Sequence, residues 1–494
     1  MNNKLTLLVA LFAGMALCFA PQGVRADVEP EFEEFEFEEF DDDFEEEEFE
    51  EEIEEMVEEE FEEMEVEEQI GGCILDTEAR LGVLCDTWST RIIGRMINDA
   101  LFINSDSENP GAFSPRSSAA GVRAARLGIA GTLYKDWIYK LEYDFALRNP
   151  DGERGQLSDA YLGYKGIRDF VFRVGNMKAV YNLDQAGDAR FDLFMESIFS
   201  DNPYGYGKPR YPGIAVSYTR DKRLSANLGA HMAPYNANED ADGADDVAVY
   251  GRITYAPYME NYWYTHVGFG GKYYNYNGSN PENRFRGAAP FSLATIDSDE
   301  VLYDTNGSRD LDNGSRGFVY DYRYTVSFDA AGGWRNYGGQ AGVTRVVQEP
   351  TSGSSIEQYA FYAQANWWLT GERNNYLPEQ GVFGRVVPVR RLGSGGLGAI
   401  GVAVRYHQLI LDSSETPTPP HANVAYNEGG RVWGITAGIT WKPNPYVKLI
   451  GEYVYVDRDR FACGSVVGAD DDAAVACRGG DTPRAVQFRA QMDF

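Results

Sequence analysis

The chain ends on AVQFRAQMDF, residues 485–494, and this stretch decides the fold because polar and apolar residues alternate to its last position. One face carries apolar residues only: Val486, Phe488, Ala490, Met492 and Phe494. The other face carries Gln487, Arg489, Gln491 and Asp493. A period of two residues indicates a β-strand with one dry face and one wet face. A chain end is normally frayed and polar, so this apolar strand predicts a partner strand that holds it.

The same alternation recurs along most of the chain. WIYKLEYDFALR (137–148) and RVWGITAGITWK (431–442) each place apolar residues on one face and polar or small residues on the other. The 32 Tyr, 27 Phe and 53 Gly favour β structure over helix. We predict sixteen strands, near 87–101, 119–133, 137–148, 157–166, 169–176, 211–220, 224–234, 246–257, 262–275, 316–328, 335–347, 356–370, 398–411, 430–442, 446–457 and 484–494.

Two architectures produce such strands. A soluble β-sandwich of this length would divide into several domains, and no linker or internal repeat marks a boundary. A transmembrane barrel needs strands of roughly 9–11 residues that are apolar outside and polar inside. We therefore predict an all-β fold, a sixteen-stranded antiparallel transmembrane β-barrel whose last strand closes against the first, since lipid tolerates no unpaired edge. An even number of strands places both termini on the periplasmic side.

Four segments are expected along the chain. Residues 1–26 have a positive start, an apolar run and a small-residue site, so we expect a signal peptide cleaved after Ala26. Residues 27–69 hold 28 acidic residues and no Lys or Arg, residues 70–86 form a linker, and residues 87–494 form the barrel. The net charge of −33 is therefore concentrated in one segment, because residues 70–494 hold 49 acidic against 42 basic residues, a net charge of −7.

The acidic 27–69 segment, expected in the periplasm, allows two interpretations. Apolar residues at helical spacing favour a helix with one apolar stripe: Phe49, Ile53, Met56, Val57, Phe61 and Met64. Like charges three and four residues apart oppose that helix and favour a solvated, disordered tail. A helix would form when acid or divalent cations neutralise the carboxylates.

Four cysteines remain after removal of Cys18 with the signal peptide, in two close pairs: Cys73 with Cys85, and Cys463 with Cys477. An even count in an oxidising compartment predicts two local disulfides. Zinc is a poorer interpretation because neither pair has the short ligand spacing. We expect no metal and no cofactor.

Several stretches resemble one known family: RAARLGIAGTLYKDWIYKLEYDFA (123–146), SDAYLGYKG (158–166), FRVGNMKAVYNLDQAG (172–187) and WWLTGERNNYLPEQGVFGRVVP (367–388). They are similar to the phosphate-selective porin O/P family of Gram-negative outer membranes. The resemblance implies a homotrimeric anion channel in outer-membrane lipid. It also implies that residues 177–210 fold inward as the third outer loop, and that residues 371–397 are tucked into the lumen. Phe494 resembles the terminal residue that the barrel-assembly machinery recognises.

Bases on the predicted lumen face are the candidate anion path, because guanidinium forks match phosphate oxygens. Strand bases are Arg91, Arg95, Arg126, Lys140, Arg173, Arg405 and Arg489. Loop bases are Lys178, Arg190, Lys208 and Arg210 on the inward loop, and Arg385, Arg390 and Arg391 on the tucked turn. The family is similar in using an arginine ladder and a lysine cluster.

An alternative interpretation makes the same bases structural. Glu142, Asp144, Asp159 and Glu452 are expected to face the same lumen, where they would pair with the bases. The parity rule also places Arg123 and Arg126 on opposite faces, so one of them is outside the lipid zone or wrongly placed.

The sequence thus predicts an outer-membrane porin for passive diffusion of small anions such as phosphate. Catalytic motifs of the GxSxG, P-loop, HExxH and CxxCH types do not occur, so we predict neither an enzyme nor a nucleic-acid-binding protein. Two alternatives remain open: a weakly selective general porin, and a structural or adhesive anchor that acts through its loops or its acidic tail.

Overall fold

The computed structural model describes most of the chain from Gln69 onward, and residues 1–68 lie outside the described residues. The expected signal peptide and nearly all of the acidic segment therefore lie outside them too. The described ranges are 69–70, 73–76, 82–85, 87–104, 118–148, 154–197, 210–232, 247–260, 262–276, 286–288, 301–304, 320–350, 355–412, 426–465, 475–478 and 482–494.

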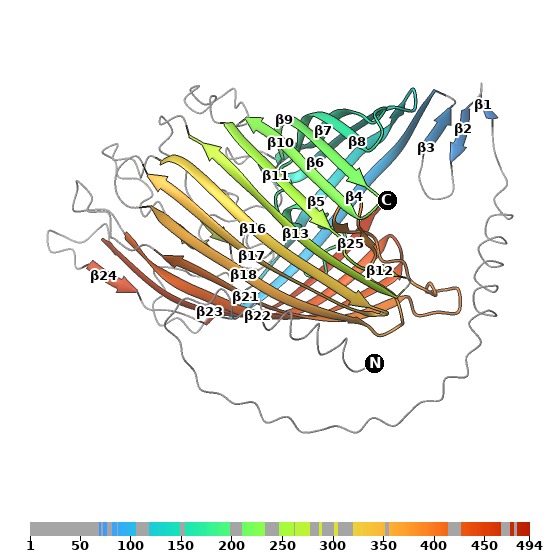
Figure 1. Ribbon diagram of the computed structural model, residues 1–494. Helices are drawn as coiled ribbons and strands as arrows, with labels where there is room; N and C mark the ends of the chain where they lie inside the picture. The colour runs from blue at the N-terminus through green and yellow to red at the C-terminus, as the bar shows by residue number, and fades with distance from the viewer. Residues whose placement is uncertain are drawn as a thin grey trace. The chain divides into compact units, whose positions relative to one another are not determined.

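Sixteen antiparallel strands form a closed ring (Figure 1). The first eight are β4 (Trp88–Asn104), β5 (Ser118–Leu133), β6 (Trp137–Arg148), β7 (Arg154–Tyr164), β8 (Phe170–Lys178), β9 (Arg210–Arg220), β10 (Leu224–Met232) and β11 (Val247–Tyr255). The second eight are β13 (Trp263–Asn275), β16 (Tyr320–Trp334), β17 (Tyr337–Pro350), β18 (Ile356–Trp368), β21 (Ala399–Asp412), β22 (Tyr426–Asn444), β23 (Val447–Ser465) and β25 (Arg484–Asp493). The predicted fold class and strand number are confirmed.

The ring closes where the last strand meets the first. β25 pairs with β4 from Arg484, opposite Asn104, to Asp493, opposite Arg95. Beyond it, the backbone N–H of Phe494 donates to Gly94 O, and Gly94 N–H donates to Phe494 O, both at 3.1 Å. The backbone of Phe494 therefore takes part in the seam that the terminal alternation predicted.

Short elements surround the ring within the described residues: β1 (Gln69–Ile70), β2 (Cys73–Asp76), β3 (Gly82–Cys85), β12 (Met259–Glu260), β14 (Arg286–Ala288), β15 (Val301–Asp304), β19 (Tyr376–Leu377), β20 (Val382–Phe383), β24 (Val475–Arg478) and helix α3 (Leu183–Ala186). β3 pairs with β4 below the end of β25, from Gly82 opposite Arg91 to Leu84 opposite Ser89. It therefore covers the part of the β4 edge that β25 leaves open. No helix among the described residues is long and apolar enough to cross a membrane.

The cysteine pairs face each other across strand ladders. Cys85 is disulfide-bonded, and the register of β2 with β3 sets Cys73 opposite it. The register of β23 with β24 sets Cys463 opposite Cys477. These backbone positions fit the predicted pairings, which remain predictions.

The two faces of the wall differ as the alternation predicts. Apolar side chains on the outer face are about half exposed, as at Phe102, Phe145, Phe269 and Phe488, and this band suits lipid. Aromatic rings follow one another across four strands where the strands meet short turns: Trp263, Trp334, Tyr337 and Trp367, with neighbouring ring centroids 5.7–6.2 Å apart. Such a row is typical of a membrane-interface girdle.

Strand boundaries differ from the prediction at the end of β23, which runs to Ser465 rather than to residue 457, and between β16 and β17. We predicted strands near 316–328 and 335–347, whereas β16 extends to Trp334 and a two-residue turn leads to β17. The stretch between Asp329 and Trp334 is AAGG, which lacks the bulky alternating residues that indicate a strand. Packing explains why residue 333 is a glycine, because an added Cβ there would lie 2.2 Å from the Tyr264 ring.

A bulge in β5 resolves the conflict over Arg123 and Arg126. The register with β4 shifts between Ile97 and Asn98, which stand opposite Ala124 and Val122, so Arg123 is the extra residue. A bulge changes which face the following residues occupy. Both arginines therefore point into the lumen, and the strict parity rule was wrong at this position.

We predict that Gly94→Ala weakens the seam. An added Cβ would lie 2.3 Å from the Phe494 ring, which must then move away from β4, and we expect a loss of about 1–2 kcal/mol in the free energy of unfolding. The measurement is urea unfolding of refolded protein in lipid vesicles. Gly332→Ala is the control, because an added Cβ there meets nothing closer than 3.4 Å.

The double variant Gly94→Ala with Phe494→Ala tests the cause. If ring and methyl group compete, the two changes together cost clearly less than the sum of the single changes. Additive losses would contradict this account of the seam.

Candidate functional site

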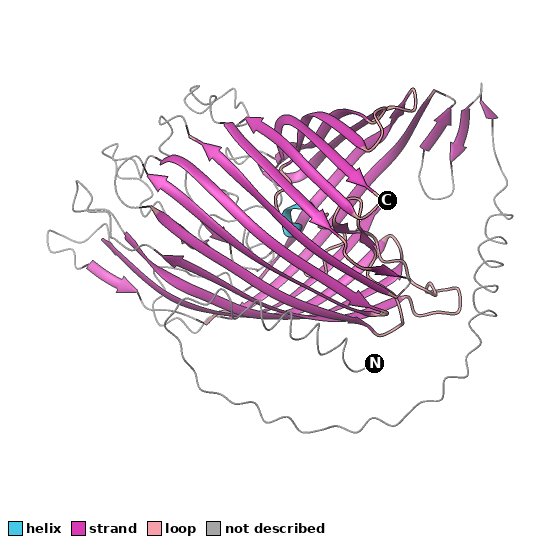
Figure 2. Cartoon of the chain, viewed as in Figure 1, coloured by secondary structure: helices cyan, strands magenta, loops and turns pink. Residues whose placement is uncertain are grey.

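Residues 179–197, here called the inward loop, leave β8 and run inside the barrel (Figure 2). The loop contains α3, whose N-cap Asn182 accepts a hydrogen bond from Gln185 N–H at 2.8 Å. Lys178 Nζ donates to the carbonyl oxygens of Ala186 and Gly187 at 3.2 and 2.9 Å. The loop start is therefore fixed by its own polar groups. Its position agrees with the third-loop prediction.

Three neighbouring strands hold the inward loop. Arg95 on β4 pairs with Asp188 at 2.8 Å, and Arg489 on β25 pairs with Glu196 at 3.0 Å. Glu452 on β23 accepts the backbone N–H of Met195 at 2.7 Å. β23, β25 and β4 are neighbours in the sheet, so these anchors hold the loop against one wall, whereas the N–H of Leu183 at the loop start donates to Asp329 on β16 at 3.1 Å. The loop therefore crosses the lumen and narrows it.

Residues 369–398, here called the tucked turn, enter from the other end of the barrel and contain β19 and β20. Thr219 on β9 donates to Glu379 O at 3.1 Å, and Arg252 on β11 donates to Gly381 O at 3.0 Å. Gly381 has a φ of +62°, and an added Cβ would lie 2.4 Å from Thr254. The position therefore requires glycine. These contacts place the turn against lumen-facing side chains, as the resemblance implied.

One carboxylate connects both ingrown segments. Asp329 on β16 is 2% exposed and accepts the N–H of Leu183, in the inward loop, at 3.1 Å. It also binds Arg252 at 2.8 Å and His266 at 2.7 Å. Arg252 holds Gly381, and His266 Nδ1 lies 2.6 Å from the hydroxyl of Tyr376, so both lead to the tucked turn. Asp329 was not among the residues predicted.

Seven of the fourteen predicted bases form ion pairs with described carboxylates. The pairs are Arg95 with Asp188 at 2.8 Å, Arg126 with Asp144 at 2.7 Å and Glu142 at 3.1 Å, Lys140 with Glu142 at 2.8 Å and Asp159 at 2.5 Å, Arg190 with Asp188 at 2.9 Å, Arg210 with Asp159 at 3.1 Å, and Arg489 with Asp99 at 2.7 Å. Arg385 pairs with Asp493. The contacts of these bases therefore fit the interpretation that they are structural better than the interpretation that they form a ladder of unpaired charges.

The other predicted bases have different surroundings. Arg173 donates to Ser217 Oγ at 3.1 Å and lies over the Tyr161 ring. Arg405 donates to Glu196 O at 3.0 Å and lies over the Phe194 ring, 4.4 Å from its centroid. Arg91, Arg390 and Arg391 are exposed, and Lys208 lies outside the described residues.

Further lumen bases were missed, among them Arg252, Lys442 and Lys448. Lys448 on β23 donates to the carbonyl oxygens of Arg190 and Asp192 at 2.8 and 3.1 Å, and Lys442 on β22 lies 3.4 Å from Val386 O. In the strand alternation, Lys442 falls on the same face as Thr440, and Lys448 falls on the same face as Glu452. The same rule that selected Arg405 would have found them.

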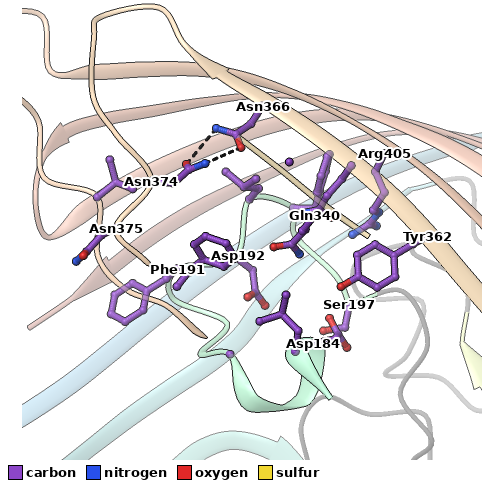
Figure 3. Close-up of a pocket in the computed structure, with 18 of the residues that line it drawn as sticks. Asp184, Phe191, Asp192, Ser197, Gln340, Tyr362, Asn366, Asn374, Asn375 and Arg405 are labelled. Atoms are coloured by element: carbon purple, nitrogen blue, oxygen red, sulfur yellow. Dashed lines mark hydrogen bonds between the residues drawn. The ribbon is translucent and has the colours of Figure 1, made fainter. Parts of the chain in front are cut away.

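A pocket with a polar lining lies where the inward loop, the tucked turn and the β17–β18 wall meet (Figure 3). It holds about 810 Å3 of empty, solvent-open space. Its polar lining comprises Asp184, Asp192, Glu196, Ser197, Gln340, Tyr362, Gln364, Asn366, Asn374, Asn375 and Arg405. Amides therefore outnumber bases here, which the sequence did not predict. Among the described residues, no group of three His, Cys, Asp or Glu side chains is placed to hold a metal ion.

Neighbouring charges fix the ionisation state of Asp188 in the inward loop. Burial alone would raise the pKa of Asp188, but Arg95 and Arg190 outweigh it and hold this pKa well below its usual range. On the tucked turn, burial raises the pKa of Tyr376. Asp188 is thus a stable anion, and Tyr376 keeps its hydroxyl proton beside His266.

A closed sixteen-stranded barrel with an apolar outer band and a narrowed polar lumen defines an outer-membrane porin. The family model described as phosphate-selective porin O and P matches residues 102–494, and the chain belongs to this family. Porin O of Pseudomonas aeruginosa is 23% identical over 365 residues, which cover 72% of this chain and 80% of that protein.

Two solved structures have similar folds. The trimer form of OmpT from Vibrio cholerae superposes with a TM-score of 0.48 at 11% identity, covering 83% of this chain and 100% of that one. An anion-selective porin from Comamonas acidovorans gives a TM-score of 0.48 at 13% identity, covering 82% of this chain and 100% of that one.

We predict that Asp329→Asn loosens the constriction. The substitution leaves Arg252 buried without its carboxylate, a loss of roughly 3–5 kcal/mol, and weakens the hold on both ingrown segments. The expected results are a noisier single-channel current and a larger cut-off for neutral polymers. Asp144→Asn is the matched control, because Asp144 is equally buried and binds Arg126 but contacts only the wall. Equal behaviour of the two variants would contradict the role of Asp329.

The pKa of Asp188 predicts acid resistance of the inward loop. A carboxylate whose pKa is depressed contributes stability fully above its unfolded value of about 3.9 and loses it only as the pH falls below. Channel conductance should therefore stay constant from pH 7 to about pH 4 and change under stronger acid. Asp188→Asn should give a noisy channel at every pH. A conductance change near pH 5 that Asp188→Asn removes would disprove this assignment.

Proposed function

We propose that the protein is a passive diffusion channel that prefers small anions, with phosphate as its candidate solute. The observation that carries the proposal is a set of lumen bases whose charge no described carboxylate neutralises within 4 Å: Arg173, Arg405, Lys442 and Lys448. Charges that line a narrow low-dielectric passage raise the local concentration of counter-ions. No catalytic step is part of this proposal.

The arrangement of these bases supports the preference. Arg405, Arg489 and Lys448 bind the backbone carbonyls of residues 190–196 one after another, along the wall formed by β21 to β25. Neutral carbonyl oxygens satisfy hydrogen bonds without cancelling charge. The positive potential of Arg405 and Lys448 therefore persists beside the inward loop. The family description and the similarity to Porin O support phosphate as the anion.

The assembly proposed with this function is a homotrimer in the outer membrane of a Gram-negative bacterium. Residues 27–69 would lie in the periplasm, and the barrel-assembly machinery would recognise Phe494. The half-exposed, apolar side chains that precede Phe494 on its face of β25, such as Phe488 and Met492, support recognition from the lipid side.

Reversal potentials in planar bilayers test the preference. Arg173→Gln with Lys448→Gln removes two lumen charges. Because each charge contributes about 0.5 kcal/mol to the preference for anions over cations, the anion-to-cation permeability ratio should fall about fivefold. Phosphate should block chloride current in the unmodified protein and less in the variant. Arg345→Gln is the control, because Arg345 pairs with Glu357 and stands opposite Val326 on the outer face.

Other outcomes identify the alternatives. Cation preference without phosphate block would make the protein a general porin. Absence of current from folded protein would favour a structural or adhesive anchor.

A further inference from the structure

We propose that the passage between the inward loop and the β17–β18 wall binds a small zwitterion, a solute with a carboxylate at one end and an ammonium group at the other. An amino acid or a dipeptide has this chemistry. The inference rests on the proposed function, since it requires an open pore, but it concerns a different class of solute from phosphate.

The wall side of the passage presents unused amide groups. Gln340 on β17 stands directly opposite Gln364 on β18, and both line the passage. Neither side chain hydrogen-bonds to another described residue. Each amide has donors and an acceptor. Two adjacent amides therefore match a peptide group or the polar middle of a small solute.

One end of the passage requires an acceptor. Arg405 is 3% exposed, and its guanidinium donates to Glu196 O, yet its Nε finds no partner within the described part of the chain. The hydroxyl of Tyr362, on the neighbouring strand, is likewise buried without a described partner. Unsatisfied buried donors cost free energy. A carboxylate placed between Arg405 and Tyr362 would accept from both.

The inward-loop side of the passage carries negative charge. Asp184 and Asp192 come from the inward loop, whereas Arg405 comes from the wall, and Figure 3 draws Gln340 between Asp192 and Arg405. A carboxylate-only solute would gain from Arg405 but be repelled by the two aspartates. A dipolar solute gains at both ends. The charge arrangement therefore favours a zwitterion over a simple anion.

Single-channel recording tests this with glycylglycine as the probe. Millimolar glycylglycine should interrupt the potassium chloride current, whereas acetate and ethylammonium at matched ionic strength, each with only one of its charged ends, should not. Arg405→Gln and Asp192→Asn should each weaken the interruption about tenfold, as expected for loss of one charge-assisted hydrogen bond.

Gln340→Ala with Gln364→Ala provides a second test that leaves every charge in place. Weaker interruption in this variant, with unchanged ion selectivity, supports the site even if the charge variants fold poorly. Arg345→Gln on the outer face is the matched control and should behave like the unmodified protein. Circular dichroism confirms that each variant is folded.

The outcomes separate this inference from the proposed function. Interruption by acetate as strong as by glycylglycine would make the passage an anion site, and equal interruption by ethylammonium would make it a cation site. Ion current with anion preference but no response to glycylglycine would overturn the zwitterion site alone. No ion current would overturn the proposed channel, and this inference with it.

Discussion

Closure of the backbone ladder is the constraint on which the rest of the structure depends. Lipid offers no hydrogen-bond partner, so each strand edge must be paired within the protein. The pairing of β25 with β4, completed by Phe494 and Gly94, removes the last edge. Once the ring is closed, alternate side chains must point inward, and polar residues are sequestered in a lumen. Closure thus creates both the membrane protein and its channel.

Charged side chains that are buried in the lumen cost free energy. An unpaired ion away from bulk water costs several kcal/mol, and most described bases reduce that cost by binding a carboxylate. Arg489 is an example of such pairing, since its side chain is 4% exposed and binds both Asp99 and Glu196. Pairing also fixes the inward loop, because Glu196 belongs to it. The anion preference that we propose therefore rests on the bases that bind carbonyl oxygens instead, such as Lys448.

The sequence predicted the architecture because strand alternation is local. All sixteen strands, and the inward position of Glu142 and Glu452, follow from a period of two residues. The partners of these side chains do not, because they depend on contacts between distant parts of the chain: Arg489 and Asp99 are 390 residues apart. The bulge at Arg123 was equally hidden, since a bulge is defined by the neighbouring strand rather than by its own residues.

Two levels of recognition follow from this arrangement. In the proposed function, bases on the β21–β25 wall act at a distance and set the sign of the ions that enter. In the proposed zwitterion site, the passage lined by Gln340 and Gln364 acts by contact and distinguishes solutes by the position of their charges. Because Asp329 ties both ingrown segments to the wall, the geometry of that passage depends on one buried carboxylate. The barrel thereby acquires a constriction from its ingrown segments, without any change in its strands.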